Sequence, residues 1–579
     1  MFTRFFGKRD WALTAVAFLL IVAQIWMDIK IPDYMGEITD AFLLNDTDVV
    51  VSRGWEMIGC ALISLTFALI TGFVLANISA SVGRNMRIAQ FDQVQAFSEE
   101  NIKKFSAASL ITRSTNDVTQ IQNFIARGLQ IFIRSPIIAI WAIIMISGSS
   151  LEWTAVTAAG VAVLIIVMMV TLHFAKIRFM RIQWLTDDVN RATRESIDGI
   201  RVIRAYNAEG YQEGRFSEAN DNLLRNNISA SKIMAPAYPI AQSTLNFVIM
   251  GIYWVGAGLI LGLDDTNEQL LLFSDMIVFT SYATMVISAF MQLFGMIRAI
   301  PRTSVGLKRV QEVVDTKPTV IGGEETEGTE HGCVEFRDVS FSYPGSGKKA
   351  LDGISFRVEE GKTLAIIGTT GSGKTTLVNL ITRFYDATEG TVMVDGLDIK
   401  EFDLRSLRSR MGYVSQSSII FSGSVDMNVN YGLGSENRTE DDIKNALEIA
   451  QADEFVYDMP DGRESHVSQH GKNLSGGQKQ RISIARALCR SPEILILDDS
   501  FSALDYKTDL ELRNALDERM GGTTRIIVAQ RVGTIKDADE ILVLDEGRLV
   551  GKGTHRHLME SCPLYREIAE SQAMQEGVL

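Results

Sequence analysis

The chain has 579 residues, too many for one hydrophobic core, so we expect at least two domains. Its formal net charge of −14 argues against a nucleic-acid-binding surface, because phosphate binding needs a basic stripe. The four cysteines have no CxxC or metal-ligand spacing, as expected of reduced thiols facing the cytosol. All seven tryptophans lie in the first half, whereas the second half is rich in charge. This distribution predicts a membrane half followed by a soluble half.

Six uncharged runs precede residue 300, and each approaches or exceeds the roughly 20 apolar residues that a bilayer-crossing helix needs. The first run is short and follows basic residues, as in a secretory signal peptide. No small-residue cleavage site follows it, so we expect a retained span. The predicted spans are Trp11–Met27, Met57–Gly83, Ser135–Leu151, Trp153–Ala175, Ile233–Leu263 and Met276–Ile297.

The positions of lysine and arginine predict the orientation of these spans. Basic residues cluster after the second and fourth spans, which places those segments and both termini in the cytoplasm. The acid-rich links Pro32–Glu56, Glu152 and Asp264–Asp275 are expected outside. Each cytoplasmic segment has about 50 residues of helix-compatible sequence, too many for a simple loop, so we expect the helices to extend beyond the membrane.

The last two spans carry methionine, aromatic and amide side chains. Such residues suit an adaptable amphipathic cavity, and they are also ordinary in helix packing. They are Gln242, Asn246, Tyr253, Tyr282, Met285, Met291, Gln292 and Met296.

The soluble half follows a stretch rich in glycine and glutamate, Gly322–Gly332, which cannot build a core. We interpret residues 319–332 as a solvated linker. The predicted domains are therefore a transmembrane domain at 1–318 and a soluble domain at 333–579.

The first strong motif of the soluble domain lies between an expected strand, Leu364–Ile367, and an expected helix, Thr376–Phe384. The pattern GxxxxGK[ST] in this context predicts a P-loop, whose backbone N–H groups surround phosphate oxygens. Lys374 would reach the β- and γ-phosphates, and the Thr375 hydroxyl would hold Mg²⁺. The P-loop residues are Gly368, Thr369, Thr370, Gly371, Ser372, Gly373, Lys374 and Thr375.

A second apolar strand is expected at Ile494–Leu497, and it ends in two adjacent carboxylates, Asp498 and Asp499. Ligands of open α/β sheets bind at the carboxyl ends of their strands. A carboxylate at the end of such a strand holds Mg²⁺ in P-loop enzymes, which suits Asp498. Gly412–Gln416 is a further short strand ending in an amide, and alone it is weak evidence.

The motif Leu474-Ser-Gly-Gly-Gln478 directly precedes a helical pattern at Lys479–Arg490. A capping serine and two glycines at a helix start form a second anion site, separate from the P-loop. With this motif the sequence resembles the ABC transporter family, specifically exporters with six spans fused to a nucleotide-binding domain, over essentially the whole chain. The resemblance implies a multidomain protein: an all-α six-helix transmembrane domain followed by an α/β P-loop ABC nucleotide-binding domain. It also implies ATP and Mg²⁺ as cofactors, with each ATP lying between one P-loop and the LSGGQ motif of a second domain.

The resemblance assigns roles to single positions. Tyr343, in Phe341-Ser-Tyr-Pro344, matches the aromatic residue that stacks on adenine. Gln416 matches the glutamine that contacts Mg²⁺ and the attacking water, so the implied metal ligands are Thr375, Gln416 and Asp498. Ser502-Ala-Leu-Asp505 matches the loop at the dimer interface. Outside the P-loop, the implied nucleotide-binding residues are Tyr343, Thr376, Ser475, Gly476, Gly477, Gln478 and Asp505.

Two cytoplasmic segments, Ile111–Val118 and Ile200–Glu209, resemble the intracellular coupling segments of this family. As patterns alone they are amphipathic helices. Their positions after the second and fourth spans favour the coupling role.

Two positions depart from the family pattern. Asp498 matches the Walker B aspartate of the family. The family has a glutamate at the next position, where this chain has Asp499, and the shorter side chain withdraws the carboxylate by roughly 1.5 Å. The family histidine that follows the next strand, Arg525–Ala529, is replaced by Gln530, which cannot carry a titrating proton. With Gln416, these residues are the candidate catalytic set. We expect a pocket that binds ATP and hydrolyses it poorly.

The intact Leu474–Gln478 motif beside this weakened site predicts a different partner chain, with the hydrolysed ATP on the partner's P-loop. The function we expect is ATP-driven export of hydrophobic or amphipathic compounds, of the multidrug-efflux type, as one half of a heterodimer in a bacterial cell membrane. The chain begins at its first span, so we expect no N-terminal peptidase domain. Lipid or peptide export, import, a slow homodimer, and a mainly regulatory ATP-binding subunit remain alternatives.

Overall fold

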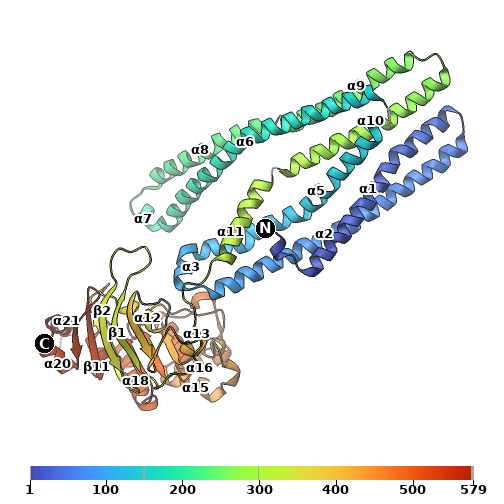
Figure 1. Cartoon of the computed structure of the whole chain (residues 1–579). Helices are drawn as coiled ribbons and strands as arrows, with labels where there is room; N and C mark the ends of the chain where they lie inside the picture. The colour runs from blue at the N-terminus through green and yellow to red at the C-terminus, as the bar shows by residue number, and fades with distance from the viewer. Residues whose placement is uncertain (1, 148–149, 298, 576–579) are drawn as a thin grey trace. The chain divides into compact units, whose positions relative to one another are not determined.

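The computed structural model describes residues 2–147, 150–297 and 299–575 of the chain (Figure 1). Its contacts divide the chain into two units. The first unit comprises Met1–Gln95 and Ala107–Thr316, and the second comprises Ala96–Ser106 and Lys317–Leu579. A short piece of the N-terminal half thus belongs to the C-terminal unit.

The first unit is built from long helices, several of which run side by side (Figure 1). Within the described residues, six helices are long and apolar enough to cross a membrane, which confirms the predicted number of spans. The elements are η1 (Phe2–Phe5), α1 (Lys8–Leu43), α2 (Thr47–Ala96), α4 (Ala107–Thr112), the π-helical turn η2 (Arg113–Asp117), α5 (Val118–Ser147), α6 (Leu151–Asp198), α7 (Ile200–Ala205), α8 (Glu209–Met234), α9 (Ala237–Leu261), α10 (Thr266–Ile297) and α11 (Ile300–Asp315).

Most of the predicted external link Pro32–Glu56 is helical: α1 continues through Pro32 to Leu43, and α2 begins at Thr47. A proline inside a helix costs one backbone hydrogen bond, which the buried packing of Pro32 tolerates here. Residues 148–149 of the predicted third span lie outside the described residues.

An ion pair joins α1 to α5 inside the first unit. Asp28 Oδ2 lies 3.0 Å from an Nη atom of Arg134, and Asp28 also accepts a hydrogen bond from Ser64 of α2. The predicted spans place Asp28 just beyond the outer end of the first span and Arg134 just before the inner end of the third. Their direct contact shows that both lie at the same level along the helix bundle, so the predicted ends of these two spans do not agree with each other. Pairing is what allows charged side chains to lie within helices of this kind.

Both predicted coupling segments lie in the first unit. Ile111–Val118 lies in α4, η2 and the start of α5, all in the first unit, where Arg113 forms an ion pair with Glu312 of α11 at 2.8 Å. The second predicted segment, Ile200–Glu209, forms α7 and the start of α8. The part of this half that groups with the nucleotide-binding unit is Ala96–Ser106, which contains the short helix α3 (Glu99–Phe105).

The second unit contains a four-stranded antiparallel sheet and a six-stranded, mostly parallel sheet. The strands are β1 (Val334–Phe341), β2 (Leu351–Val358), β3 (Thr363–Gly368), β4 (Glu389–Val394), β5 (Leu397–Asp398), β6 (Met411–Val414), β7 (Gly423–Ser424), β8 (His466–Val467), β9 (Ile494–Asp498), β10 (Thr524–Val528), β11 (Glu540–Asp545) and β12 (Arg548–Gly553). Its other helices are α12 (Lys374–Ile381), α13 (Leu404–Ser409), α14 (Val425–Val429), α15 (Glu440–Ile449), α16 (Asp453–Tyr457), α17 (Gly476–Leu488), α18 (Tyr506–Arg519), α19 (Val532–Ile535), α20 (His555–Ser561) and α21 (Pro563–Gln575).

The six-stranded sheet has the order β12-β11-β3-β10-β9-β6. Successive residues of β9 enter opposite cores: Ile494 and Ile496 belong to one buried cluster, and Leu495 and Leu497 to the other. Burial on both faces explains why this strand carries no charge until its end. Because β6, β9, β10 and β3 are neighbouring parallel strands, their carboxyl ends meet at one edge of the sheet.

The glycine-rich segment before β1 is mostly exposed to solvent, and its backbone is also hydrogen-bonded within the second unit. The N–H groups of Gly323 and Thr329 donate to the carbonyls of Phe402 and Asp395, at 2.8 and 2.7 Å. A Cβ atom at Gly323 would lie only 2.0 Å from the Glu401 carbonyl oxygen. The glycine therefore permits a close backbone approach that composition alone did not indicate.

Candidate functional site

The P-loop links β3 to α12, as the motif predicted. Gly371 and Gly373 have φ angles of +83° and +100°, in the region that glycine adopts without strain. A Cβ atom at Gly373 would also lie 2.7 Å from the carbonyl oxygen of Ala350. The loop therefore needs glycine at both positions to turn its N–H groups toward a phosphate.

Lys374 folds back over its own loop. Its ammonium group donates to the carbonyls of Gly368 and Thr369, at 2.9 and 2.8 Å. Burial lowers the pKa of Lys374, and the carboxylates of Asp499 and Asp498 act in the opposite direction. A cation held at this place is available to an anionic ligand that displaces the two carbonyls.

Asp498 and Thr375 form the expected metal corner. The Thr375 hydroxyl donates to Asp498 Oδ1 at 3.4 Å, a long contact. Asp498 Oδ2 is buried and has no hydrogen-bond partner among the described residues. Burial raises the pKa of Asp498, because a desolvated carboxylate is less stable in its charged form. A buried carboxylate oxygen without a partner, beside a hydroxyl, is a suitable ligand pair for Mg²⁺.

The three candidate catalytic side chains converge on one oxygen atom. Gln416 and Gln530 each donate a side-chain N–H to Asp499 Oδ2, at 3.2 and 2.7 Å. Gln416 was predicted at the end of a strand. It lies two residues beyond the end of β6 and belongs to the following turn. Asp499 itself is buried, 8% exposed, and has a φ angle of +51°, which is uncommon for a residue other than glycine. Sequence reasoning brought these residues to one sheet edge, but it gave no sign of this shared acceptor.

The Leu474–Gln478 motif begins α17 with reciprocal caps. Ser475 N–H donates to Gln478 Oε1 at 2.9 Å, and Gln478 N–H donates to Ser475 Oγ at 3.2 Å. A Cβ atom at Gly476 would meet nothing within 4 Å, whereas one at Gly477 would lie 3.2 Å from the Ala503 carbonyl. The capped N-terminus of this 13-residue helix is exposed, and a helix N-terminus favours an anionic ligand.

Asp505 belongs to the neighbouring loop and caps α18, accepting a hydrogen bond from Thr508 N–H at 2.7 Å. That hydrogen bond is the main cause of the lowered pKa of Asp505. Among the described residues, no hydrogen bond joins Ser475, Gln478 or Asp505 to the P-loop. We call α17, with the Leu474–Gln478 motif at its start, the signature helix. It and the P-loop are thus separate sites within one chain.

Tyr343 is half-buried near the start of α12. Its hydroxyl lies 3.0 Å from the Thr376 hydroxyl, and its ring packs edge-on against Phe341 and Tyr385, with centroids 4.9 and 5.3 Å apart. These contacts fix the ring beside the P-loop helix, and an aromatic ring at this place suits stacking on an aromatic base. Tyr385 was not among the predicted site residues.

Comparisons with known proteins identify the family of the chain. Residues 14–290 match the family described as ABC transporter transmembrane region, and residues 351–502 match ABC transporter. The computed structure has a TM-score of 0.83 with a bacterial Atm1-family ABC exporter solved with ATP bound, at 23% identity and covering 98% of each chain. At this identity the likeness shows the shared exporter fold.

Full-length relatives agree. An uncharacterized ABC transporter ATP-binding protein of Mycobacterium tuberculosis is 35% identical over 98% of this chain and 97% of its own length. The uncharacterized ABC transporter ATP-binding protein YfiB of Bacillus subtilis is 34% identical over the same shares. An ATP-dependent lipid A-core flippase of Pseudomonas aeruginosa is 32% identical over 88% of this chain and 82% of its own length. The chain therefore belongs to the ABC transporter family, as an integral membrane half-transporter in which a transmembrane region is fused to an ATP-binding domain.

Proposed function

We propose that this chain is the weakly hydrolytic half of a heterodimeric ABC exporter, in a bacterial cell membrane with its nucleotide-binding domain in the cytoplasm. The observation that carries the proposal is the capture of Asp499 Oδ2 by the two amides of Gln416 and Gln530. A carboxylate oxygen has about two lone-pair directions, so both directions on Oδ2 are used. Only Oδ1, on a side chain one carbon shorter than the family glutamate, is left to activate water.

The loss of hydrolysis expected from this arrangement is large. A general base acts only within hydrogen-bond reach of the proton it removes, and a misplaced base forfeits roughly 10²–10⁴ in rate. Gln530 cannot compensate, because an amide donates to a phosphate oxygen but carries no titrating proton. ATP binding does not depend on this base. The P-loop glycines, Lys374 and the buried Oδ2 of Asp498 remain available for nucleotide and Mg²⁺.

The signature helix favours an unlike partner. Its caps are complete and the space around Gly476 is open, so it can contact an ATP bound to another chain's P-loop. This chain combines a weakened hydrolytic site at Asp499 with an intact signature helix. The combination is useful if the partner has an intact hydrolytic site and a weakened signature helix. In this scheme ATP closes the two domains, the transmembrane helices change access, and hydrolysis on the partner's P-loop resets them.

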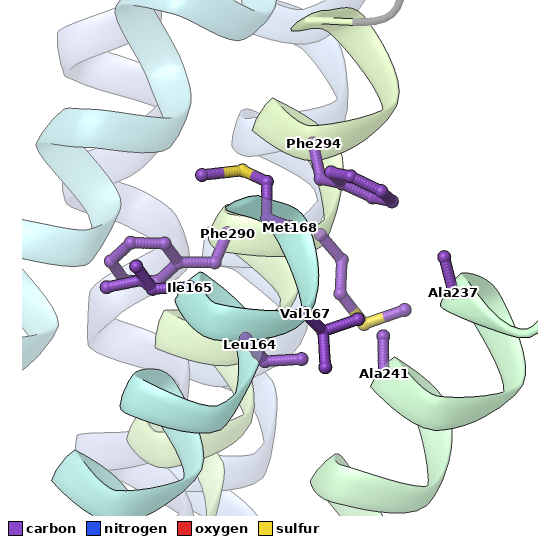
Figure 2. Close-up of a pocket in the computed structure, with 9 residues that line it drawn as sticks. Leu164, Ile165, Val167, Met168, Ala237, Ala241, Phe290 and Phe294 are labelled. Atoms are coloured by element: carbon purple, nitrogen blue, oxygen red, sulfur yellow. The ribbon is translucent and has the colours of Figure 1, made fainter. Parts of the chain in front are cut away.

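The substrate we propose is hydrophobic or amphipathic. Figure 2 shows apolar side chains of α6, α9 and α10 around a small cavity, with Met168 beside the aromatic rings of Phe290 and Phe294. The cavity holds only about 20 Å³, far below the roughly 300–1,000 Å³ of a ligand site, so a substrate cavity requires the second half. Flexible methionine and aromatic surfaces suit varied apolar ligands. The resemblance to lipid A-core flippases keeps a lipid-like amphiphile as the second candidate.

The decisive experiment is co-purification with a second half-transporter, followed by transport of drug or lipid into vesicles. We expect Asp499→Asn to leave transport nearly unchanged and neutralisation of the partner's corresponding glutamate to abolish it. Asparagine keeps an oxygen acceptor for both glutamine amides, so it tests charge without disturbing the local packing. An ordinary ATPase rate from the purified chain alone, lost in Asp499→Asn, would instead establish an active homodimer.

A further inference from the structure

Helix α3 is anchored to the C-terminal unit by its first turn. Asn101 is buried and donates its side-chain N–H to the carbonyl of Lys317 at 3.4 Å. Its Oδ1 accepts from Thr319 N–H at 3.3 Å and from Ser98 N–H at 3.1 Å, the latter as a helix cap. These contacts hold a seven-residue helix that follows α2 after only Phe97 and Ser98.

The last turn of α3 places one cation against two aromatic rings. Lys103 donates a hydrogen bond to the Tyr385 hydroxyl at 2.8 Å. Its ammonium nitrogen lies 5.3 Å from the ring centroid of Tyr385 and 5.5 Å from that of Tyr343. The hydrogen bond that Lys103 donates to Tyr385 is the main cause of the raised pKa of Lys103, so the side chain stays charged at neutral pH. The distance to the Tyr343 ring lies within the range of cation–π attraction, whereas the contact with Tyr385 is made mainly through its hydroxyl.

We propose that Lys103 is a positioning residue for the adenine ring, which it orients through Tyr343. The proposal rests on the proposed ATP site at Tyr343. The hydroxyl of Tyr343 is already held by Thr376, and its ring by T-shaped packing with Phe341 and Tyr385. The ammonium group covers one face of the ring, and the base stacks on the other. A cation on one face draws electron density from the ring and makes the opposite face a better surface for an electron-rich purine.

This arrangement also connects the base to the transmembrane helices. Helix α3 follows α2 with only two residues between them, so the position of Lys103 is linked through a short stretch of backbone to the end of α2. By linkage, if α3 in its docked position strengthens adenine binding, then adenine binding must stabilise the docked position of α3 to the same degree. In this proposal the coupling runs through the base, so a ligand that consists of phosphate groups alone should not show it.

The effect is expected to be modest, because the Lys103 side chain is 61% exposed. A cation–π contact at an exposed site changes affinity by about two- to fivefold.

The test compares ADP with pyrophosphate, which lacks the base, by calorimetric titration of the full-length chain in lipid nanodiscs. Neither ligand is hydrolysed, so a slow ATPase does not affect the result. We expect Lys103→Met to weaken ADP binding about two- to fivefold and to leave pyrophosphate binding unchanged, with Lys103→Arg close to wild type. Lys104→Met is the matched control, since the ammonium group of Lys104 lies against Phe105. Equal weakening of both ligands, or the same loss in Lys104→Met, would overturn the proposal.

A double-mutant cycle with Tyr343→Leu gives an independent readout. If Lys103 acts through the ring, its substitution has no further effect on ADP affinity once the ring is removed. Amide hydrogen exchange supplies the reciprocal measurement: ADP should protect residues 99–105 of the wild-type chain, and pyrophosphate should not. The proposed role of Lys103 is contradicted if the two substitutions have additive effects on ADP affinity, or if ADP and pyrophosphate protect residues 99–105 equally. Failure of the wild-type chain to bind ADP would instead refute the proposed ATP site.

Discussion

The side-chain amide of Gln530 donates a hydrogen bond to Asp499, with 2.7 Å between Nε2 and Oδ2. The backbones of both residues are fixed as well. Asp499 N–H donates to the Val528 carbonyl at 2.9 Å, and Gln572 of α21 donates to the Gln530 carbonyl at 2.7 Å. The two side chains that depart from the family pattern are therefore hydrogen-bonded to each other, and further hydrogen bonds hold both of their backbones in place.

Restoring both family residues should restore hydrolysis. The double substitution Asp499→Glu/Gln530→His lengthens the carboxylate and replaces the amide by a group that can carry a proton. We expect the ATPase rate of the purified full-length chain in lipid to rise about 10²-fold, with a smaller gain from either single change. A steady-state phosphate-release assay measures this. No gain from the double variant would show that something other than these two side chains limits hydrolysis.

The signature helix should matter for the partner's ATP. Gly476→Glu adds a carboxylate at the first turn of α17. The helix dipole stabilises negative charge there, and the space around the Cβ position is open, so the fold should tolerate the change. The same carboxylate repels a γ-phosphate. We expect an unchanged melting temperature and about a hundredfold loss of ATPase activity in the heterodimer, comparable to the loss of one transition-state hydrogen-bond donor.

The control for this variant is Gly522→Glu. Gly522 is exposed and has no atom within 4 Å of its Cβ position. It precedes β10, at the edge of the sheet opposite the P-loop. Normal ATPase activity in Gly476→Glu would show that this helix does not contact the hydrolysed ATP.

Asp498 should bind Mg²⁺ at some cost in stability. Its raised pKa means that the fold disfavours the charged carboxylate, so Asp498→Asn should not lower the melting temperature in the absence of Mg²⁺. The same change should remove the increase in ATP affinity that Mg²⁺ gives to the wild-type chain. Thermal scans and ATP titrations with and without Mg²⁺ test both points. A variant that still gains affinity from Mg²⁺ would exclude Asp498 as a ligand.

The ion pair between α1 and α5 should stabilise the transmembrane unit. Arg134→Met leaves Asp28 as an unpaired carboxylate, and we expect a loss on the order of 1–3 kcal/mol, seen as a lower melting temperature in detergent. Adding Asp28→Asn removes the unpaired charge and should recover most of the loss. A double variant less stable than Arg134→Met alone would show that the two side chains act independently.

Close approach should make Gly323 intolerant of a side chain. Gly323→Ala must move the Glu401 backbone, and we expect destabilisation on the order of 1–3 kcal/mol in thermal unfolding. Gly347→Ala is the matched control, because a Cβ atom at Gly347 meets nothing within 4 Å. Equal stability of the two variants would indicate that this segment is as loosely attached as its composition suggests.

The sequence by itself determined the elements whose physics is local. Six runs of uncharged residues predicted six helices long enough to cross a membrane. In lipid every backbone polar group must be hydrogen-bonded internally, and a single apolar run can achieve this only as a helix. The P-loop and the Leu474–Gln478 cap were readable because their function depends on glycines and a serine at fixed spacing. The carboxylates at the end of β9 were placed at the ligand edge because a charge-free strand must be buried on both faces.

Only the tertiary structure decided which side chains meet. Gln416 and Gln530 follow different strands, and their common acceptor on Asp499 depends on the strand order β10-β9-β6 and on the left-handed backbone of Asp499. The Asp28–Arg134 pair and the contact of Lys103 with Tyr343 and Tyr385 join residues more than 100 positions apart. Such contacts depend on how helices and sheets pack, and a linear pattern of charge and hydrophobicity does not encode that packing.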